Sequence, residues 1–257
     1  MSSPPLPPPP PPSTNTFTHS PTLELYTLPL PTFLTTPHYT HTHTHPLTLT
    51  PTTHIVTGAL LFAANPSPPP TTTTTITTTP NQPPEEQRIL LLRRAPTDSY
   101  PGRWEAPGGS CDATDASILA GAAREVYEET GLRVSRFRAL VGVDAWEVVR
   151  ADGVRKVVKF TFLVDVDDTP PTERLGGDRV QRGELDGGVE GDGGGGGLGG
   201  IRLEPAEHDA FVWATEEEVR AGVVWLRGER VGMEFVGRQA ENYLRGFEVV
   251  RSLPRGV

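Results

Sequence analysis

Residues 124–131 read Arg-Glu-Val-Tyr-Glu-Glu-Thr-Gly, and this short run holds three glutamates. Glu125, Glu128 and Glu129 are three and four residues apart, so on a helix they share one face. Leucine and alanine residues before the run supply an apolar side for packing, and Gly131 suits the left-handed conformation that ends many helices. Carboxylates gathered on one helix face are the hard oxygen ligands that Mg²⁺ requires. The pattern therefore predicts a helix that carries a divalent-metal site.

The plain alternative is a solvated acidic helix face. Like charges four residues apart on an exposed helix cost only about 0.2–0.5 kcal/mol, and Arg124 with Glu128 makes an ordinary ion pair at the same spacing. Repulsion therefore does not exclude this alternative. The neighbouring residues favour the metal site, because Pro107-Gly108-Gly109 lies upstream and Gly131 closes the helix, and together they make a loop–helix frame.

The run resembles the sequence box of the Nudix hydrolase family. That box reads Gly, five residues, Glu, seven residues, Arg-Glu-apolar-x-Glu-Glu-x-Gly-apolar, and residues 124–132 match every fixed position of its second half. In the first half, the family's glutamate falls on Ala116 and its glycine on Ser110. Gly108-Gly109 therefore stands one residue too far upstream, as if the loop carried one extra residue. Asp115 is the acidic residue nearest to the missing glutamate.

The resemblance is specific from Tyr100 to Leu132 and looser over most of residues 54–250. It implies an α/β (α+β) fold, namely an α/β/α sandwich around a mixed β-sheet. It also implies a divalent-metal-dependent hydrolase, with Mg²⁺ or Mn²⁺ as cofactor. Such an enzyme cleaves the pyrophosphate bond of a nucleoside diphosphate linked to another group, or of a related diphosphate. The partner is then a small diphosphate molecule, and the sequence leaves the attached group open.

The resemblance also assigns roles to residues of the run. It makes Glu125 and Glu129 the principal metal ligands. Glu128 binds a second metal or orients water, and Arg124 holds the glutamates by ion pairing, so both count among the catalytic residues. The carbonyl of Gly109, or of the glycine before it, completes the metal shell. Divalent cations suit this reaction because they offset the negative charge with which a diphosphate repels an attacking nucleophile.

A second candidate segment, residues 204–208, reads Glu-Pro-Ala-Glu-His. In many enzymes of the Nudix family, a carboxylate from a loop far from the box completes the metal shell or acts as base. Glu207 is the preferred candidate for that catalytic role, because Pro205 turns Glu204 away. His208 is the second candidate, since the ordinary pKa of histidine lies near neutrality. The alternative is that both are ordinary solvated loop residues.

Two functions from different classes stay open. The first is the hydrolase, which the three box glutamates favour. The second is a non-catalytic Nudix-fold module that binds or senses a nucleotide or diphosphate ligand. Ala116 and Ser110 favour caution about the enzyme. Isomerase chemistry on a diphosphate fits poorly, because it depends on a catalytic cysteine and Cys111 lies in the box loop.

Composition limits the remaining possibilities. With a net charge of −9 and a pI of about 5.3, the chain lacks the basic footprint that binding to a nucleic-acid backbone requires. Cys111 is the only cysteine, which excludes an intramolecular disulfide framework. The amino terminus lacks the pattern of a secretory signal, and the longest apolar run, 58–64, is too short to span a bilayer. The sequence thus predicts a cytoplasmic or nuclear protein without a membrane partner and leaves its oligomeric state open.

Low-complexity segments divide the chain of 257 residues. Residues 1–53 are rich in Pro, Thr and His and are predicted to be mostly disordered, with an edge strand or extended arm at 22–36. Residues 54–250 are predicted to form a single domain with flexible insertions at 65–86 and 183–200. The tail also holds alternating histidines that suit a transition metal, although a low-complexity tract is the preferred interpretation; they are His41, His43 and His45.

Hydrophobic patterns predict the elements of this domain. They place strands at 54–63 and 88–94, a helix from Ser117 to Thr130, strands in 137–149 and 157–166, a strand at 211–213, a capped helix at 215–222 and a terminal amphipathic helix. Trp104 is interpreted as a packing residue rather than one that stacks on a base. Arg93 and Arg94 are either phosphate contacts or solvated residues.

Overall fold

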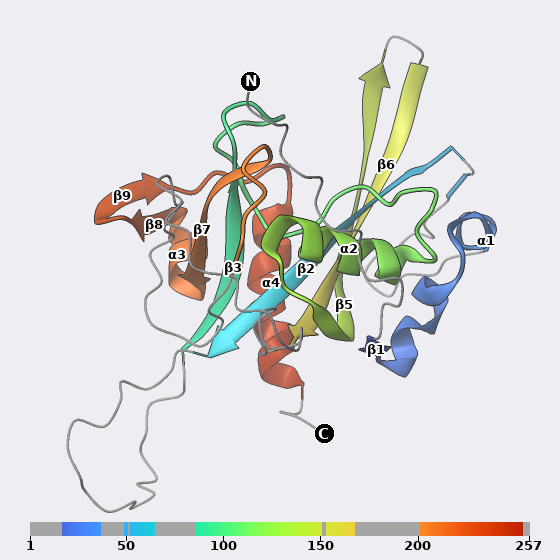
Figure 1. The fold of residues 1–257 in the computed structure, drawn as a ribbon, viewed down its shortest axis with the longest axis horizontal. Helices are drawn as coiled ribbons and strands as arrows, with labels where there is room; N and C mark the ends of the chain where they lie inside the picture. Colours follow the sequence, from blue (N-terminus) through green and yellow to red (C-terminus); the bar gives the residue numbers. More distant parts are fainter. Residues whose placement is uncertain are drawn as a thin grey trace, which may run out of the picture.

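The computed structural model describes residues 17–36, 49–50, 52–64, 86–150, 153–167 and 201–253 (Figure 1). Its elements are β1 (Thr18–His19), the 3₁₀ helix η1 (Pro21–Thr27), α1 (Leu30–Thr35), β2 (His54–Ala64), β3 (Gln87–Arg94), β4 (Trp104–Glu105), α2 (Ile118–Thr130), β5 (Val134–Arg150), β6 (Gly153–Val166), β7 (His208–Thr215), α3 (Glu216–Ala221), β8 (Val223–Leu226), β9 (Glu229–Gly232) and α4 (Gln239–Ser252). The alternating histidines of the tail, the predicted insertion at 183–200 and most of that at 65–86 lie outside the described residues. Among the helices that the structure describes, none is long and apolar enough to cross a membrane.

Seven strands form one sheet in the order β1-β5-β6-β2-β3-β4, and β7 also pairs with β3. β1 runs parallel to β5 and β2 parallel to β6, whereas the other pairs are antiparallel, so the sheet is mixed. β8 and β9 form a separate hairpin. Figure 1 shows α2 and α4 on opposite faces of the sheet. The predicted sandwich of helices around a mixed sheet is therefore confirmed.

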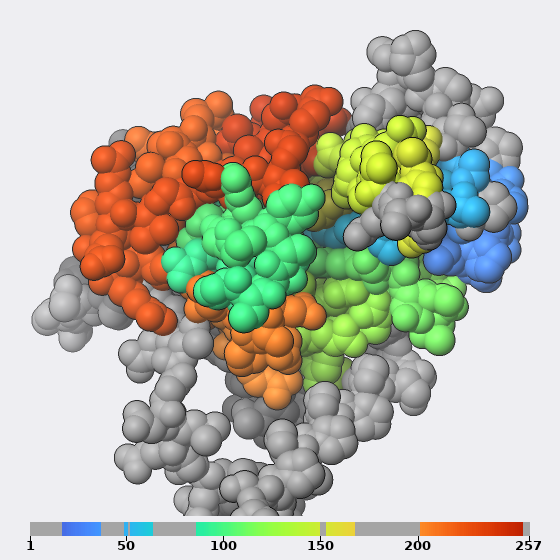
Figure 2. Space-filling view, turned by 90° about the horizontal axis from the view of Figure 1, so that it is seen from above, coloured from blue at the N-terminus to red at the C-terminus, as the bar shows by residue number. Residues whose placement is uncertain are grey.

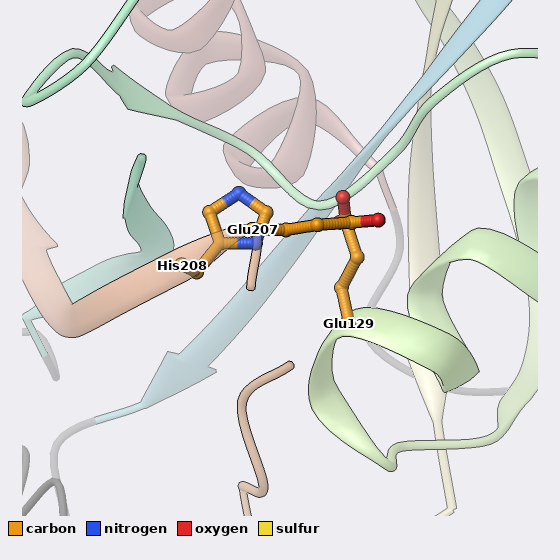
Figure 3. Close-up of side chains that lie close together, drawn as sticks. All are labelled: Glu129, Glu207 and His208. Carbon is orange, nitrogen blue, oxygen red and sulfur yellow. The ribbon is translucent and has the colours of Figure 1, made fainter. Parts of the chain in front are cut away.

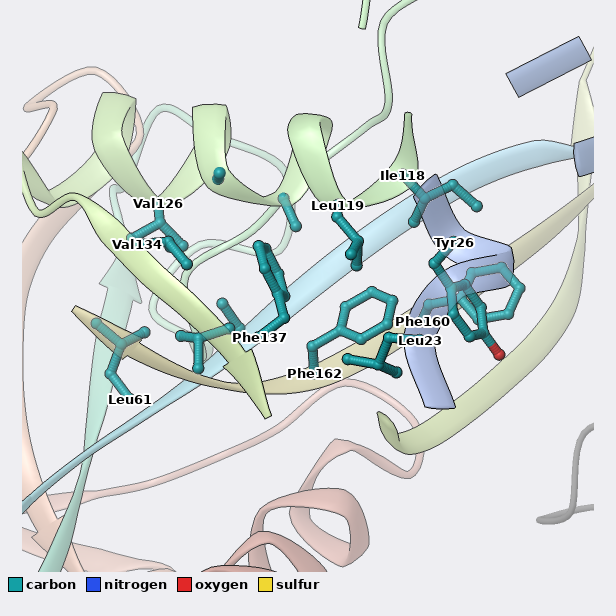
Figure 4. Close-up of a cluster of buried hydrophobic side chains, with 14 of the residues drawn as sticks. Leu23, Tyr26, Leu61, Ile118, Leu119, Val126, Val134, Phe137, Phe160 and Phe162 are labelled. Atoms are coloured by element: carbon teal, nitrogen blue, oxygen red, sulfur yellow. The ribbon is translucent and has the colours of Figure 1, made fainter. Parts of the chain in front are cut away.

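Strand β6 is buried on both faces because it lies near the middle of the sheet. Phe160 and Phe162 join the apolar cluster beneath α2, where they share the core with Val126 (Figure 4). Leu163 points the other way and joins the cluster beneath α4, with Tyr243. Successive side chains of a strand alternate between faces, so one strand serves both layers. The alternation that the sequence predicts for this strand is present.

Helix α2 begins and ends where the sequence predicts. The hydroxyl of Ser117 accepts a hydrogen bond from the N–H of Ala120 at 3.2 Å. At the other end, Gly131 adopts a φ of 72° in the left-handed region. Both devices satisfy backbone groups that a helix end leaves free. The predicted capping box of α3 is likewise present, between Thr215 and Glu218.

Residues 17–36 differ from the prediction because they are largely helical instead of extended. η1 and α1 each carry a proline in the first two positions, where the missing N–H costs no hydrogen bond. The segment buries Leu23, Tyr26 and Phe33 against the sheet. The rings of Tyr26 and Phe160 have centroids 5.4 Å apart in an edge-on contact. This part of the amino-terminal region thus belongs to the packed core.

Trp104 in β4 is fully buried, and its Nε1–H donates to the carbonyl of Gly232 at 3.2 Å. The indole therefore fills the wall of the domain, as the packing interpretation predicts. Its burial leaves no ring face on which a base could stack.

Candidate metal centre

The carboxylate of Glu129 lies at the inner side of α2, where only 3% of the residue is exposed. It accepts a hydrogen bond from the N–H of Gly108 at 2.7 Å. Gly108 has a φ of 145°, and a Cβ at this position would lie 2.3 Å from the carbonyl oxygen of Thr57. Only glycine fits here. Because residue 108 is a glycine, the loop can approach β2 closely and also donate a hydrogen bond to the helix.

The loop continues along β2 as an extra pairing partner. The N–H of Thr57 donates to the carbonyl of Gly109 at 2.8 Å, and the N–H of Ala59 donates to that of Pro107 at 2.8 Å. The Thr57 hydroxyl also donates to the Gly109 carbonyl at 3.3 Å. A Cβ at Gly109 would lie 2.6 Å from Oε2 of Glu125. Gly109 therefore makes room for a glutamate, while the carbonyl that was predicted to complete a metal shell is engaged in pairing with β2.

Arg124 gathers the acidic groups at the outer side of the helix. Its Nε and Nη2 bind the two oxygens of Asp115, each at 3.0 Å. Its Nη1 lies 3.0 Å from Glu125 and 2.7 Å from Glu128, and Nη2 donates to the carbonyl of Ser110 at 3.0 Å. The predicted role of Arg124 as an ion-pairing anchor fits this geometry. Asp115 thus provides an acidic partner for Arg124, although position 116, where the family has a glutamate, is an alanine.

The three glutamates of α2 differ in exposure. The side chain of Glu128 is 47% exposed and points outward to Arg124, whereas that of Glu125 is 13% exposed. Burial raises the pKa of Glu125 to about 7; the charges of Glu128 and Glu207 add to this rise, and Arg124 opposes it. Glu125 thus sits between the outer ion pairs and the inner site.

The segment 201–208 brings the second candidate residues to the helix (Figure 2). The N–H of Arg202 donates to the carbonyl of Thr130 at the end of α2, at 2.9 Å. Further on, the N–H of Ala95 donates to the carbonyl of Glu207 at 2.8 Å. These two bonds fasten the segment between α2 and β3.

Glu207 and His208 consequently face the inner side of α2 (Figure 3). One ligand atom from each of Glu129, Glu207 and His208 lies within 4.8 Å of the other two. Glu207 is exposed, but His208 is only 1% exposed, so it is not the solvated loop residue of the alternative interpretation. The two segments that the sequence singled out separately therefore meet in one place.

Glu105 is a member of this site that the sequence analysis missed. It is buried in β4, where its Oε1 lies 3.1 Å from Nε2 of His208 and pairs with the guanidinium of Arg94. Burial raises the pKa of Glu105, but the His208 hydrogen bond and the charges of Lys159 and Arg94 outweigh it, and the pKa lies below its ordinary value. The sequence did offer one signal, an acidic residue between the apolar residues Trp104 and Ala106. A charge in such a buried place needs partners, which marks it as a candidate site residue.

The two arginines that end β3 have partners of their own. Arg93 forms a two-pronged pair with Asp209, with Nε 2.7 Å from Oδ1. Arg94 binds Asp98 as well as Glu105. Both guanidiniums are therefore held by carboxylates in this structure.

Negative charge therefore accumulates around Glu129. Burial raises the pKa of Glu129 well above its ordinary value, and the charges of Glu105, Glu125 and Glu207 raise it further, against the Gly108 hydrogen bond. Carboxylates crowded in this way favour any species that adds positive charge, either a proton or a metal cation.

Residues 78–187 match the sequence model of a family described as NUDIX domain. The resemblance to the Nudix family is confirmed over these residues. The match contains the glycine loop and the whole of α2, and it ends before the segment that carries Glu207 and His208. This match supports a Nudix-type hydrolase in general terms. No curated protein matches the chain.

Several solved structures resemble the chain at low identity. The MutT protein from Methanosarcina mazei Go1 is 21% identical, with a TM-score of 0.42, over 78% of this chain and 96% of its own. RenU, a Nudix hydrolase from M. Smegmatis, is 18% identical, with a TM-score of 0.44, over 79% of this chain and 89% of its own. The NUDIX domain of Shewanella oneidensis NrtR, solved with ADP ribose, is 14% identical, with a TM-score of 0.42, over 77% of this chain and 88% of its own. These likenesses assign neither substrate nor activity.

Proposed function

We propose that the chain is a divalent-metal-dependent hydrolase that cleaves the pyrophosphate bond of a nucleoside diphosphate linked to another group, or of a related diphosphate. The observation that supports this most is the meeting of Glu129 with Glu207, two carboxylates from distant segments. Within the described residues, neither carboxylate has an ion pair with Lys or Arg, although Glu129 is buried. A buried carboxylate without a counter-charge is costly, so a cation fits this place.

The donors suit the cofactor that the resemblance implies. Glu125 and Glu129 offer oxygens from neighbouring turns of α2, and Glu207 offers a third from the opposite side. Carboxylate oxygens are the donors that Mg²⁺ and Mn²⁺ prefer. When bound, such a cation offsets charge on the phosphoryl oxygens and eases attack at phosphorus.

The remaining residues orient the other groups of the site or transfer protons. Glu207 is the exposed member of the inner group, so its carboxylate oxygen that does not bind the cation is the candidate to take a proton from the attacking water. Glu128 lies on the outer, exposed side, where it orients water or holds a second cation. Arg124 fixes Glu125 and Glu128 through its ion pairs and is a positioning residue.

A screen for cleavage of the pyrophosphate bond tests the proposal, with the two phosphomonoester products converted to inorganic phosphate by an added phosphatase and measured as such. Nucleotide sugars, dinucleotide cofactors, coenzyme A, oxidised nucleotides and inositol polyphosphates would each be offered with Mg²⁺ or Mn²⁺. We expect turnover of one class that stops in excess chelator and in Glu129→Gln, with the melting temperature of the variant close to that of the wild type. A well-folded protein that turns over none of these compounds contradicts the proposal.

Binding of one class without turnover would instead support the alternative, a non-catalytic module that senses a nucleotide or diphosphate. In the sequence, Ala116 at the position of the family's glutamate favours caution about the enzyme. In the structure, Asp115 provides the acidic partner of Arg124, which weakens the objection to an enzyme. The cytoplasmic or nuclear location and the lack of nucleic-acid or membrane partners stay predictions.

A further inference from the structure

The two ring nitrogens of His208 have different surroundings. Nε2 lies 3.1 Å from Oε1 of Glu105. Nδ1 is buried and has no hydrogen-bond partner among the residues that the structure describes. In Figure 3 one ring nitrogen lies on the side of Glu207 and Glu129, and the other points away from both. The unpartnered nitrogen is therefore directed into the group of carboxylates.

Glu105 decides which nitrogen carries the proton. Its carboxylate is paired with Arg94, which keeps it ionised, and an ionised carboxylate only accepts hydrogen bonds. Nε2 of His208 must then be the donor, and a neutral ring is left with a lone pair on Nδ1. The second nitrogen of a metal-binding histidine is commonly held by a carboxylate in this manner, which fixes both the tautomer and the ring orientation.

The groups that face Nδ1 are acceptors as well. Ligand atoms of Glu129, Glu207 and His208 lie within 4.8 Å of one another. Two carboxylates and a lone pair repel one another unless a proton or a cation lies between them. Leaving a buried ring nitrogen unpaired is also unfavourable, so this arrangement is completed by something that accepts electron pairs from all three groups.

We propose that Nδ1 of His208 is a metal ligand, which with Glu129 and Glu207 forms a two-oxygen, one-nitrogen site for a first-row transition dication such as Mn²⁺, Co²⁺ or Zn²⁺ in preference to Mg²⁺. Mg²⁺ prefers oxygen donors throughout, whereas an imidazole ligand favours the transition metals. The inference rests on the proposed function, because it refines the metal of the same site. The competing arrangement is a protonated Glu129 that donates to Nδ1 without any metal.

The experiment detects a bound nitrogen directly. The histidine tract is first removed as a source of nitrogen ligands, by changing His41, His43 and His45 to Ser. Pulsed EPR of bound Mn²⁺ in this full-length protein then reports any ¹⁴N coupling, and Co²⁺ and Mg²⁺ affinities are measured by titration. We expect ¹⁴N coupling and Co²⁺ affinity at least about tenfold above that for Mg²⁺.

The variant His208→Asn places an amide group near the position of Nδ1. It is expected to abolish the ¹⁴N coupling and to lower Co²⁺ affinity by about tenfold or more, with a much smaller effect on Mg²⁺. His54→Asn, at a histidine that bonds Ser110 instead, is the matched control and should keep the coupling. The protein with His208 intact already decides whether nitrogen is bound, so the test does not depend on the folding of the variant.

The outcomes separate the two proposals. Mn²⁺ that binds without ¹⁴N coupling, or coupling that survives His208→Asn, overturns the role of His208 and leaves the hydrolase untouched. Failure of every dication to bind and to support turnover overturns the hydrolase itself.

Discussion

The N–H of Gly108 donates a hydrogen bond of 2.7 Å to Oε2 of Glu129, which joins the glycine loop to the glutamate helix. The bond holds a buried carboxylate at the point where Glu207 and His208 arrive from the carboxyl-terminal part of the chain. It fixes the position of the carboxylate and partly opposes the rise in its pKa. The site is therefore shaped before a cation enters, and a cation would compete with a proton for Glu129.

Glu129→Gln should lower metal-dependent turnover by at least about 10²-fold, because the amide still accepts the Gly108 hydrogen bond but no longer attracts a cation. Glu125→Gln should act in the same direction. The measurement is the rate constant at saturating substrate against Mg²⁺ or Mn²⁺ concentration. Glu217→Gln, on the exposed side of α3, is the control. Near-normal rates in both site variants would show that these carboxylates do not hold the metal.

Arg124→Met should reduce the free energy of unfolding by about 3 kcal/mol, because it strands the buried carboxylate of Asp115. Arg220→Met removes an exposed pair with Glu216, which has the four-residue spacing of Arg124 and Glu128, and should lower the free energy of unfolding by under about 1 kcal/mol. Urea unfolding in the presence of chelator measures both. Equal effects of the two substitutions would contradict the anchoring role of Arg124.

The metal-free protein should lose stability as the pH rises from about 4.5 to 7.5. The pKa of Glu125 is about 7, above its ordinary value near 4.3, so in this window the folded state binds more protons than the unfolded state. Glu125→Gln should make the fall in stability shallower without removing it, because the pKa of Glu129 is raised as well. Added Mg²⁺ should restore stability most at the alkaline end, where the carboxylates are ionised. Unfolding free energies at pH 5, 6, 7 and 8 test this, and a rise with pH in chelator would contradict it.

Phe33→Ala should lower the free energy of unfolding by about 3–5 kcal/mol, because the ring is fully buried beside Tyr26 and Phe160. Thr32→Ala, at the exposed neighbour in α1, should change stability by less than about 0.5 kcal/mol. Thermal and urea unfolding compare the two. If Phe33→Ala were as mild as its control, residues 17–36 would not be part of the core.

Glu207→Gln should lower the rate constant at saturating substrate by about 10²-fold, with the melting temperature unchanged, since the side chain is exposed. Glu204→Gln is the matched control on the same turn, where the carboxylate only caps the N–H of Ala206. A wild-type rate for Glu207→Gln across the pH range would assign the proton transfer to the residues of α2.

Local chemistry in the sequence was sufficient to predict α2 between Ser117 and Gly131, the capping box at Thr215 and the alternating strand 157–166. Caps and left-handed glycines act on partners within a few residues, and strand alternation repeats every second residue. The same local spacing predicted that Glu125, Glu128 and Glu129 share a helix face.

Only the tertiary structure decided how that face is used. Packing of α2 on the sheet turns Glu129 inward and leaves Glu128 half-exposed, a rotation that helical spacing does not specify. Glu105 and His208 are 103 residues apart and meet because β3 pairs with both β4 and β7. Strand register follows from the burial of whole faces, so no local pattern around either residue contains it.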